Sequence, residues 1–397
     1  MTDGTAGQVA HRTCEASNVE PAPSVLHIAQ PTDGGVQRYL IEVCSDQLAR
    51  GWPVTVACPD GPLAADLRAL GVSWRSWPAA RSPGPATIRE TLAVRRIIQS
   101  VSPDVVHLHS SKAGLAGRIA VRRRRPTIFQ PHGWSWLAVT GRFKWLTVRW
   151  ERFAARWTTV VVCVGHDEAT AANAIGVQAR MDVIRNGVNR AYFAPTGEWG
   201  KRSARRELGV APATPLVVCA GRVTRQKGQD ILLAAWCSVR ARCPDAQLAI
   251  VGDGDLLAEL CRGAGDGVRF VPTVADIRPW FAAADVVALP SRWEGLPLVA
   301  LEAGAMGRPV VGCAVAGLIE ILTPQVGCVV PPENPAALAD ALARRLTEPA
   351  LAQAEGRAAA ALSEQFDQRH TLDELARLTV AVASGELRDT NPRNAAQ

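Results

Sequence analysis

Two carboxylates, Glu294 and Glu302, lie eight positions apart in the segment Ser291-Arg-Trp-Glu-Gly-Leu-Pro-Leu-Val-Ala-Leu-Glu302. A glycine-bearing turn leads from the first carboxylate into an apolar helical run that ends at the second. Because eight residues are a little over two helical turns, we expect both side chains near one face, about 12 Å apart along the axis. The free N–H groups at the start of such a helix attract anions. The segment therefore suits a ligand with a central phosphate and hydroxyl-bearing rings at both ends, such as a nucleotide sugar.

A second segment supplies positive charge. An apolar run ends at Gly221, and Arg222, Lys227 and Gly228 follow before another helical pattern. Arg offers a planar fork to phosphate oxygens, and Lys offers a mobile point charge. A solvated basic loop would account for either residue alone, but their place between a strand and a helix favours phosphate binding. Their expected role is to neutralise a diphosphate leaving group, whose charge grows in the transition state.

These two segments, together with Ile184-Arg-Asn-Gly-Val188, form an ordered set. The set resembles the C-terminal half of glycosyltransferase family 4 (group 1), whose members are retaining, nucleotide-sugar-dependent enzymes with the GT-B fold. The resemblance extends from about Val25 to about Leu378. It implies that Glu302 accepts hydrogen bonds from ribose hydroxyls and that Glu294 holds hydroxyls of the donor sugar near the reacting carbon.

The resemblance also implies further contacts to the donor. Thr32-Asp-Gly-Gly35 follows the first strand, where glycines permit positive φ and close approach of the backbone, although an ordinary turn is the alternative. Pro297 has no N–H, so the amides that face the phosphate are those after it. The base is expected to contact backbone near Pro272–Val274. The expected donor site consists of Gly34, Gly35, Asn186, Arg222, Lys227, Val274, Glu294, Leu298, Val299 and Glu302.

Histidines follow two strands of the N-terminal half. His132 matches a family position whose imidazole or backbone contacts the donor sugar, and it completes a catalytic set with Glu294, Arg222 and Lys227; a structural role is the usual alternative for a lone histidine. His107 and His109 alternate along one strand, and we expect them to face opposite sides, which disfavours a shared metal ion. His109 or Ser110 is expected to line the acceptor side instead. The phrase His-Ser-Ser-Lys-Ala-Gly resembles family members that build cell-surface polysaccharides or lipid-linked oligosaccharides.

No metal and no cofactor beyond the nucleotide sugar is expected. Asp253-Gly-Asp255 has the ends of a metal-binding Asp-x-Asp pair, but in this family the segment is a strand-to-helix turn. Gly252-Asp-Gly254 lacks the third glycine of a dinucleotide fingerprint, which argues against a dehydrogenase. The 10 Cys contain no Cys-x-x-Cys pair, so the pattern disfavours a zinc site and a disulfide framework and fits a reducing cytoplasm.

The elements that must position these residues read as two series of short apolar strands alternating with amphipathic helices. Such series predict two α/β, Rossmann-like, doubly wound parallel-sheet domains facing across a cleft, with the ligand at the carboxyl ends of the strands. The strands of the first series are expected at 25–29, 54–57, 105–109, 127–130, 160–164 and 183–184. Those of the second series are expected at 216–220, 248–251, 268–271, 286–289, 310–312 and 328–330.

The two series imply a division of the chain. The expected parts are a tail (1–22), an N-terminal acceptor-side domain (23–191), a linker (192–202), a C-terminal donor domain (203–368), a helix that crosses back (369–384) and a second tail (385–397).

Composition narrows the class of protein. A chain of 397 residues with 48% hydrophobic residues suits two globular cores. No apolar run approaches the roughly 20 residues that span a bilayer. The first residues do not resemble a secretory signal. Residues 1–190 carry 23 Lys or Arg and 14 Asp or Glu, a net +9, whereas the rest carries 21 and 23, a net −2. A basic half favours anionic lipids, phosphorylated acceptors or nucleic acid as partners; solubility is the alternative.

The helical pattern Gly141–Thr158 is both basic and rich in tryptophan. One apolar stripe is expected to pack on the sheet. A second stripe beside it could lie on an anionic membrane surface, as basic amphipathic helices do. The second stripe consists of Trp145, Arg149, Arg152 and Arg156. Packing in the core and contact with lipid are both compatible with the pattern.

We therefore expect a cytoplasmic glycosyltransferase, peripheral on the inner face of the cell membrane, that uses a nucleotide-diphosphate sugar. The donor is expected to be UDP-linked, and the acceptor a hydroxyl of a lipid-linked or cell-surface saccharide precursor. Two alternatives remain: a nucleotide-sugar epimerase, and a non-catalytic nucleotide-sugar sensor or membrane scaffold. The intact Glu-x7-Glu and Arg–Lys motifs disfavour both. No nucleic-acid-binding module is recognisable. The sugar, linkage, base and oligomeric state stay open.

Overall fold

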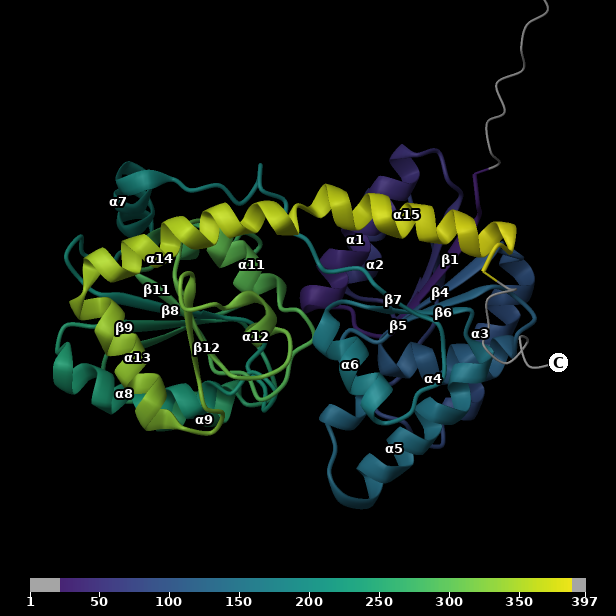
Figure 1. Cartoon of the computed structure of the whole chain (residues 1–397), viewed down its shortest axis with the longest axis horizontal. Helices are drawn as coiled ribbons and strands as arrows, with labels where there is room; N and C mark the ends of the chain where they lie inside the picture. Colours follow the sequence, from purple (N-terminus) through teal and green to yellow (C-terminus); the bar gives the residue numbers. More distant parts are fainter. Residues whose placement is uncertain (1–21, 388–397) are drawn as a thin grey trace, which may run out of the picture.

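A computed structural model describes residues 22–387, so the expected tails lie almost wholly outside the described residues. The chain forms two halves, each built on a parallel sheet with helices on both faces (Figure 1). This arrangement confirms the predicted fold class. Short strands rich in valine, isoleucine and leucine form both sheets because the helices bury both of their faces.

The N-terminal half has a seven-stranded sheet in the order β3-β2-β1-β4-β5-β6-β7. On one face it carries α3, α4, α5 and α6, and on the other α1 and α2. The strands are β1 (Val25–Ala29), β2 (Val54–Cys58), β3 (Ser73–Ser76), β4 (Val105–His109), β5 (Thr127–Gln130), β6 (Val160–Cys163) and β7 (Met181–Val183). The helices are α1 (Gly34–Ala49), α2 (Pro62–Ala69), α3 (Thr87–Val101), α4 (Ser110–Val121), α5 (Gly141–Ala154) and α6 (His166–Ala174).

The C-terminal half has a six-stranded sheet in the order β10-β9-β8-β11-β12-β13. The strands are β8 (Leu216–Ala220), β9 (Gln247–Val251), β10 (Val268–Val271), β11 (Val286–Leu289), β12 (Val310–Cys313) and β13 (Gly327–Val330). The helices are α7 (Gly197–Leu208), α8 (Gln229–Arg242), α9 (Leu257–Gly263), α10 (Arg278–Ala283), α11 (Leu298–Ala305), α12 (Leu318–Ile321), α13 (Pro335–Thr347) and α14 (Pro349–Leu362).

Each sheet has a point where the strand order reverses. In the N-terminal half the reversal lies between β1 and β4, and in the C-terminal half between β8 and β11. The chains that leave two such strands diverge, so their loops leave room at the carboxyl edge. Gly34 begins α1 directly after the loop that follows β1, and the loops after β8 and β11 carry Arg222 and Glu294. The topology thus places three of the motifs at the positions where open parallel sheets bind ligands.

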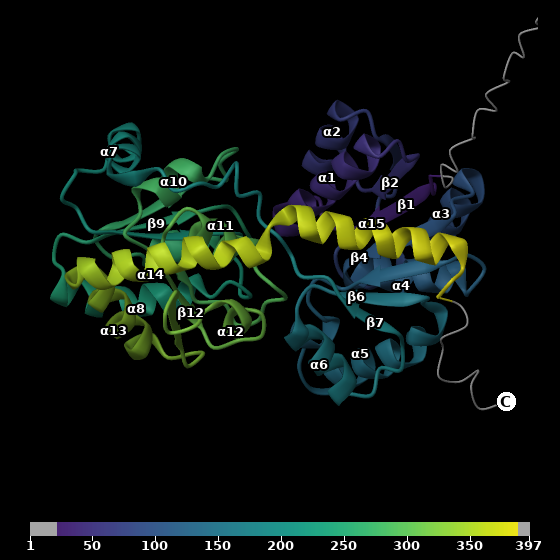
Figure 2. The ribbon, with the colours of Figure 1, turned by 45° about the horizontal axis from the view of Figure 1, so that its top comes forward.

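The last helix, α15 (Gln368–Ser384), returns to the N-terminal half. Its Leu375, Leu378 and Val382 pack against Val105 and Ile128 of the first sheet. Figures 1 and 2 show α14 over the C-terminal half and α15 continuing over the N-terminal half. The helix ties the two halves together at the side away from α5.

Two local features differ from the sequence prediction. The strand β3 was absent from the expected series because its sequence, Ser-Trp-Arg-Ser, is polar and mostly exposed at the sheet edge. The helix α7 begins at Gly197, inside the segment 192–202 that we expected to be a linker. Its strongly polar sequence, rich in Arg and Glu, hides the helical pattern.

Candidate active site

Glu294 lies in the loop between β11 and α11 and is held by two donors. Lys227 Nζ lies 2.6 Å from Glu294 Oε1, and Ser291 Oγ donates to the same oxygen at 2.6 Å. Glu294 is 6% exposed. Gly228 explains the approach, since a Cβ there would lie 2.1 Å from the carbonyl oxygen of Pro290. Only glycine therefore allows the start of α8 to bring Lys227 against Glu294.

Glu302 lies on α11 and faces the other half of the molecule. Arg38 of α1 donates from Nη1 to Glu302 Oε1. The second carboxylate oxygen, Oε2, is buried and has no hydrogen-bond partner among residues 22–387. Burial raises the pKa of Glu302, and Arg38 opposes that shift. Glu302 is thus an acceptor with one side of its carboxylate unused.

The two glutamates do not share a helical face. The helix α11 begins only at Leu298, after Pro297, so Glu294 belongs to the loop before it. The sequence Glu-Gly-Leu-Pro breaks the helical pattern, because proline disfavours helix in the residue before it. The expected separation along one axis was therefore wrong.

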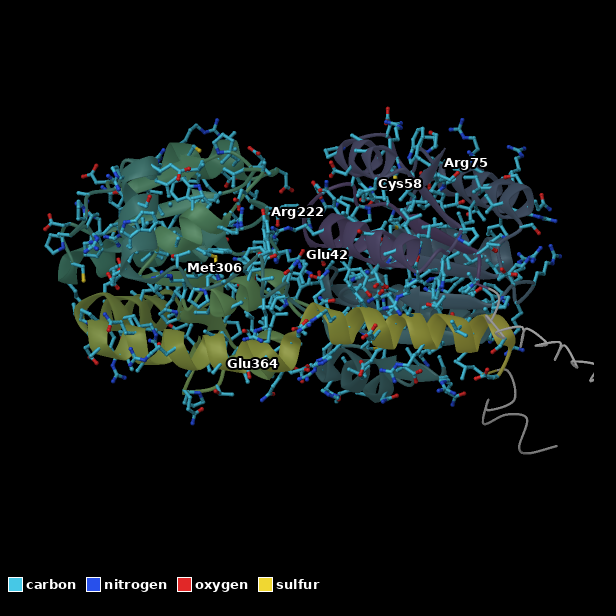
Figure 3. All side chains as sticks on the ribbon, turned by 90° about the horizontal axis from the view of Figure 1, so that it is seen from above. Glu42, Cys58, Arg75, Arg222, Met306 and Glu364 are labelled. Atoms are coloured by element: carbon cyan, nitrogen blue, oxygen red, sulfur yellow. The ribbon has the colours of Figure 1, made fainter. Side chains whose placement is uncertain are left out.

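Arg222 stands at the boundary between the halves (Figure 3). A Cβ on Gly34 would lie 3.6 Å from Arg222 Nε, and a Cβ on Gly35 would lie 3.9 Å from Leu298 Cδ1. Burial lowers the pKa of Arg222, with repulsion from Arg81 as the next cause. Gly34, Gly35, Arg222 and Leu298 are therefore neighbours, as the expected donor site requires.

The loop that carries His132 touches the loop that carries Glu294. A Cβ on Gly295 would lie 3.4 Å from the nitrogen of Gly133 and 3.5 Å from the carbonyl carbon of His132. His132 has φ +52 and Gly133 has φ +102, so this turn uses left-handed backbone. The sequence predicted His132 and Glu294 in one catalytic set, and the loops that carry them are in direct contact.

Glu168 fixes this turn, and the sequence did not single it out. Its carboxylate accepts hydrogen bonds from the backbone nitrogen of Gly133 at 2.6 Å and from that of Val164 at 2.7 Å. Burial raises the pKa of Glu168 to about 7. The only signal in the sequence was its position in the first turn of α6. Acidic residues are common there because they interact favourably with the helix dipole, so the position alone does not indicate a functional residue.

Asn186 and Val274 take different places. Asn186 is buried and donates from Nδ2 to the carbonyl oxygen of Leu296 at 2.7 Å, so it braces the Glu294 loop from the N-terminal half. Val274 is half-buried after β10 and packs against the core of the C-terminal half. Asn186 thus joins the cluster directly, whereas Val274 lies on the C-terminal side where we expected the base.

The first helix contributes two further residues that the sequence did not reveal. Arg38 and Glu42 follow Gly34 at intervals of four, so all three lie on one face of α1. Burial raises the pKa of Glu42 to about 7, with repulsion from Glu302 as the second cause and Arg38 opposing. Figure 3 shows Glu42 on the side of the N-terminal half that meets the C-terminal half. The helical periodicity from Gly34 would have identified both.

Three histidines gather on one face of the first sheet, which corrects our expectation. His27 pairs with His107 in the register of β1 and β4, and the rings of His107 and His109 lie 4.0 Å apart. Side chains two residues apart on a strand point the same way, so placing His107 and His109 on opposite sides was an error. Their ligand atoms lie within 4.8 Å of one another and could bind a metal ion. His109 is fully buried, so it does not line a surface for an acceptor.

Ser110, the other acceptor-side candidate, begins α4 directly after His109. Its backbone has φ +73, and its hydroxyl is buried with no partner within the described part of the chain. It therefore packs beside the histidines rather than on an open surface.

The basic helix α5 does not pack its apolar stripe on the sheet. Its buried residues are Glu151 and Ala154, while Phe143, Leu146 and Phe153 of the expected apolar stripe are 57%, 50% and 44% exposed. The expectation that this stripe packs on the sheet was therefore wrong for these three residues. The buried face of the helix is instead marked by Glu151, which pairs with the buried Arg118 at 2.6 Å.

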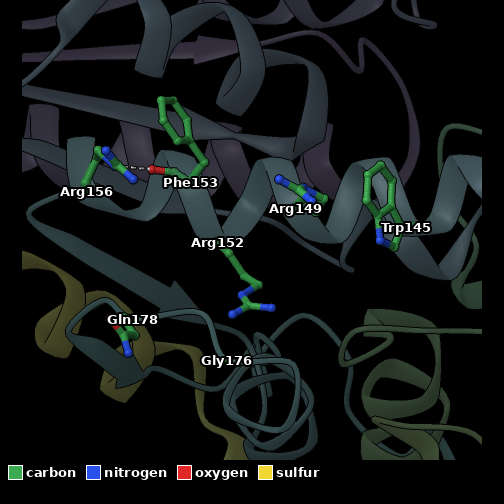
Figure 4. Close-up of a pocket in the computed structure, with 7 residues that line it drawn as sticks. All are labelled: Trp145, Arg149, Arg152, Phe153, Arg156, Gly176 and Gln178. Atoms are coloured by element: carbon green, nitrogen blue, oxygen red, sulfur yellow. Dashed lines mark hydrogen bonds between the residues drawn. The ribbon is translucent and has the colours of Figure 1, made fainter.

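A surface pocket of about 480 Å³ lies along α5 (Figure 4). The guanidinium of Arg149 lies 4.6 Å from the ring centre of Trp145, and that of Arg156 lies 4.1 Å from the ring centre of Phe153. Arg152 points to the turn at Gly176. The expected membrane-facing residues are thus gathered in one exposed, positively charged hollow. Within residues 22–387, no helix is both long and apolar enough to cross a membrane.

Comparison with known proteins identifies the family. The family model "Glycosyltransferase Family 4" matches residues 33–192, and "Glycosyl transferases group 1" matches residues 214–348. The chain is 35% identical over 198 residues to the GDP-mannose-dependent monoacylated alpha-(1-6)-phosphatidylinositol monomannoside mannosyltransferase of Corynebacterium glutamicum, which covers 47% of this chain and 52% of that protein. That match thus spans about half the length of the relative.

A second relative matches most of both chains. The GDP-mannose-dependent alpha-(1-6)-phosphatidylinositol monomannoside mannosyltransferase of Mycolicibacterium smegmatis is 30% identical over 353 residues, covering 82% of this chain and 89% of that one. The Anabaena protein HepE, solved in complex with UDP and glucose, shares the fold with a TM-score of 0.77 at 24% identity, over 90% of this chain and 99% of that one. The ordered motifs, the two facing sheets and these matches agree: the chain belongs to glycosyltransferase family 4 and has the GT-B fold.

Proposed function

We propose that this protein transfers a sugar from a nucleotide-diphosphate donor to a hydroxyl acceptor and retains the anomeric configuration. The observation that carries the proposal is the meeting of Lys227, Glu294 and Arg222 at the boundary of the two halves. Lys227 holds the carboxylate of Glu294 in place for sugar hydroxyls with one donor, and its other donors and the guanidinium of Arg222 remain for phosphate.

The roles follow from the contacts. Arg222 and Lys227 would neutralise the departing diphosphate, and the free amides of Leu298 and Val299 at the start of α11 would hold its oxygens. Glu302 would accept one ribose hydroxyl at its unpartnered Oε2 and a second at Oε1, in place of Arg38. The diphosphate, leaving on the face where the acceptor arrives, would take the acceptor proton. Catalysis would then need no metal ion and no cofactor.

Two nucleotide sugars are candidates for the donor. The HepE structure contains UDP, which supports the UDP-linked donor expected from the sequence. The mannosyltransferases of C. glutamicum and M. smegmatis are named for GDP-mannose, which makes GDP-mannose the second candidate. Both names also contain phosphatidylinositol monomannoside, which supports a lipid-linked acceptor here.

A lipid-linked acceptor fits the surface of α5. We propose that the protein is peripheral on an anionic membrane face, with Trp145 and the three arginines of the pocket against the headgroups. The N-terminal half would then receive the acceptor, and the C-terminal half the donor.

The test is transfer itself. The purified chain is incubated with UDP-glucose, UDP-galactose or GDP-mannose and a membrane lipid extract, and the product anomer is read by NMR. Retention in a lipid product supports the proposal. An inverted product would remove the front-face mechanism. A rearranged nucleotide sugar formed in the absence of acceptor would point to the epimerase, and binding with no turnover to the scaffold.

A further inference from the structure

Four side chains form a hydrogen-bonded chain that begins at His132 and runs into the first sheet. His132 Nε2 lies 3.1 Å from His109 Nδ1, and His109 Nε2 lies 3.0 Å from His27 Nδ1. His27 Nε2 lies 2.8 Å from Gln47 Oε1. His27 and His109 are fully buried, and Gln47 is 2% exposed. The chain therefore links the interior of the N-terminal half to the loop that touches Glu294.

Neighbouring elements hold these rings in place. His27 and His109 come from the adjacent strands β1 and β4, and Gln47 from α1, which covers that face. The edge of the Tyr39 ring meets His132, with the ring centres 5.0 Å apart, and Gln130 donates to the hydroxyl of Tyr39 at 3.0 Å. Tyr39 of α1, itself held by Gln130 of β5, therefore packs against the ring of His132 and restrains it.

Hydrogen-bond chemistry gives the chain a direction. In the orientation of the Gln47 amide in this structure, the carbonyl oxygen faces His27 Nε2 and only accepts, which places the proton of His27 on Nε2. Burial lowers the pKa of His27 to about 4 and that of His132 to about 3, so the rings are neutral at pH 7. A neutral ring with Nε2–H offers Nδ1 as an acceptor, so His109 donates to His27, and His132 donates to His109. All three rings are thereby the same tautomer.

The backbone at both ends of the last link is unusual. His132 has φ +52, and Ser110, which directly follows His109, has φ +73. Residues other than glycine rarely adopt this region, and such strain persists where the surroundings over-determine it. The turns at Ser110 and His132 adjoin the hydrogen bond between the rings of His109 and His132. Within residues 22–387, no hydrogen bond reaches His132 Nδ1.

We propose that His27, His109 and Gln47 are positioning residues. They keep the Nε2–H of His132 in a hydrogen bond to His109 and leave Nδ1 of His132 to accept a hydroxyl of the transferred sugar. The assignment rests on the proposed function. A comparable arrangement, in which a buried acceptor fixes the tautomer of a histidine, governs catalysis in serine proteases.

A metal ion is the competing occupant of the same histidines. An ion between His27 Nδ1 and His109 Nε2 would replace the proton that joins them. The separation of 3.0 Å is an ordinary hydrogen-bond distance. Three neutral imidazoles would also leave a divalent ion without counter-charge in a fully buried place. These two observations favour the proton.

The test compares His109→Asn with His109→Leu, two side chains of similar size. Asparagine keeps an oxygen near the position of Nδ1 to accept from His132, and leucine does not. His132 is read by ¹⁵N NMR of histidine-labelled full-length protein, and kinetics are read with the donor that the transfer assay identifies. We expect His109→Leu to mix the tautomers of His132 and to lower kcat at least about tenfold with an unchanged KM for the donor. We expect His109→Asn to preserve the Nε2–H tautomer and most of kcat.

His107→Leu is the matched control. His107 is buried beside His109 on the same face but lies outside the chain, so its loss should lower stability and leave the tautomer of His132 unchanged. A wild-type His132 spectrum with wild-type kcat in His109→Leu would overturn the proposal, as would stoichiometric zinc in the purified protein by elemental analysis. Because the spectrum needs no substrate, an absence of transferase activity would remove the proposed function and leave the tautomer result to be judged separately.

Discussion

Arg38 on α1 pairs with Glu302 on α11 across the boundary between the two halves. The arginine side chain is 38% exposed and the glutamate 5%, so the pair lies at the rim of the buried interface. If Glu302 binds two ribose hydroxyls, one can use the unpartnered Oε2, and the other must take the place of Arg38 at Oε1. The donor would then exchange this contact between the halves for one of its own.

A double-mutant cycle measures this exchange. Arg38→Met and Glu302→Gln should each destabilise the free protein, with a coupling energy of about 1–2 kcal/mol, because each single change leaves its partner unpaired. Saturating nucleotide should reduce the coupling, since ribose hydroxyls then occupy Glu302. Equal coupling with and without nucleotide, measured by chemical unfolding, would remove Glu302 from the donor site.

The Lys227–Glu294 contact should be necessary for turnover. Lys227→Ala and Glu294→Gln should each lower kcat by at least about 100-fold, the usual cost of removing one transition-state contact. Circular dichroism should show an intact fold. Arg242→Ala on α8, whose arginine pairs with Asp340 at the surface, is the control and should keep nearly full activity. Near-normal turnover in either site variant would refute the site.

Glu42 should make stability depend on pH. Its pKa lies at about 7 in the folded protein, above its ordinary value of 4.5. Between these values the folded state binds more protons than the unfolded state, so the free energy of unfolding falls as pH rises from about 4.5 to 7. Glu42→Gln should therefore match the wild type at pH 4 and be more stable at pH 8. The exposed Glu259→Gln on α9 is the control. A difference that does not vary with pH would contradict the assignment.

The pocket along α5 should bind anionic membranes. Replacing Arg149, Arg152 and Arg156 together by Ser should weaken binding to phosphatidylglycerol vesicles by about 1 kcal/mol per arginine, and salt should weaken the wild type in the same way. The triple variant Arg89→Ser, Arg95→Ser, Arg96→Ser makes the same charge change on the exposed face of α3. Equal losses in both triple variants would mean that general charge, rather than this pocket, binds the lipid.

The sequence predicted the sheets better than the details of the site. Strands of valine and leucine revealed both parallel sheets because burial on two faces leaves a clear apolar run. The polar edge strand β3 and the polar helix α7 carry no such signal. Gly34, Arg222 and Glu294 were found because they stand in local motifs.

Contacts between distant segments could not be predicted in this way. Arg38 meets Glu302 across 264 positions, and Glu168 meets Gly133 across 35, and neither pair has a local pattern. The grouping of the histidines, in contrast, was available from the sequence, since the two-residue period of a strand already places His107 and His109 on one face.

The central claim is that Arg222, Lys227, Glu294 and Glu302 bind a nucleotide-diphosphate sugar without a metal ion. Thermal unfolding with UDP, GDP, ADP and their sugars, in EDTA and in magnesium, tests it most directly. We predict stabilisation by one nucleotide series, equal in EDTA and magnesium, of about 2.7 kcal/mol at 100 times the dissociation constant, and its loss in Lys227→Ala. No stabilisation by any nucleotide, or stabilisation only with magnesium, would contradict the account.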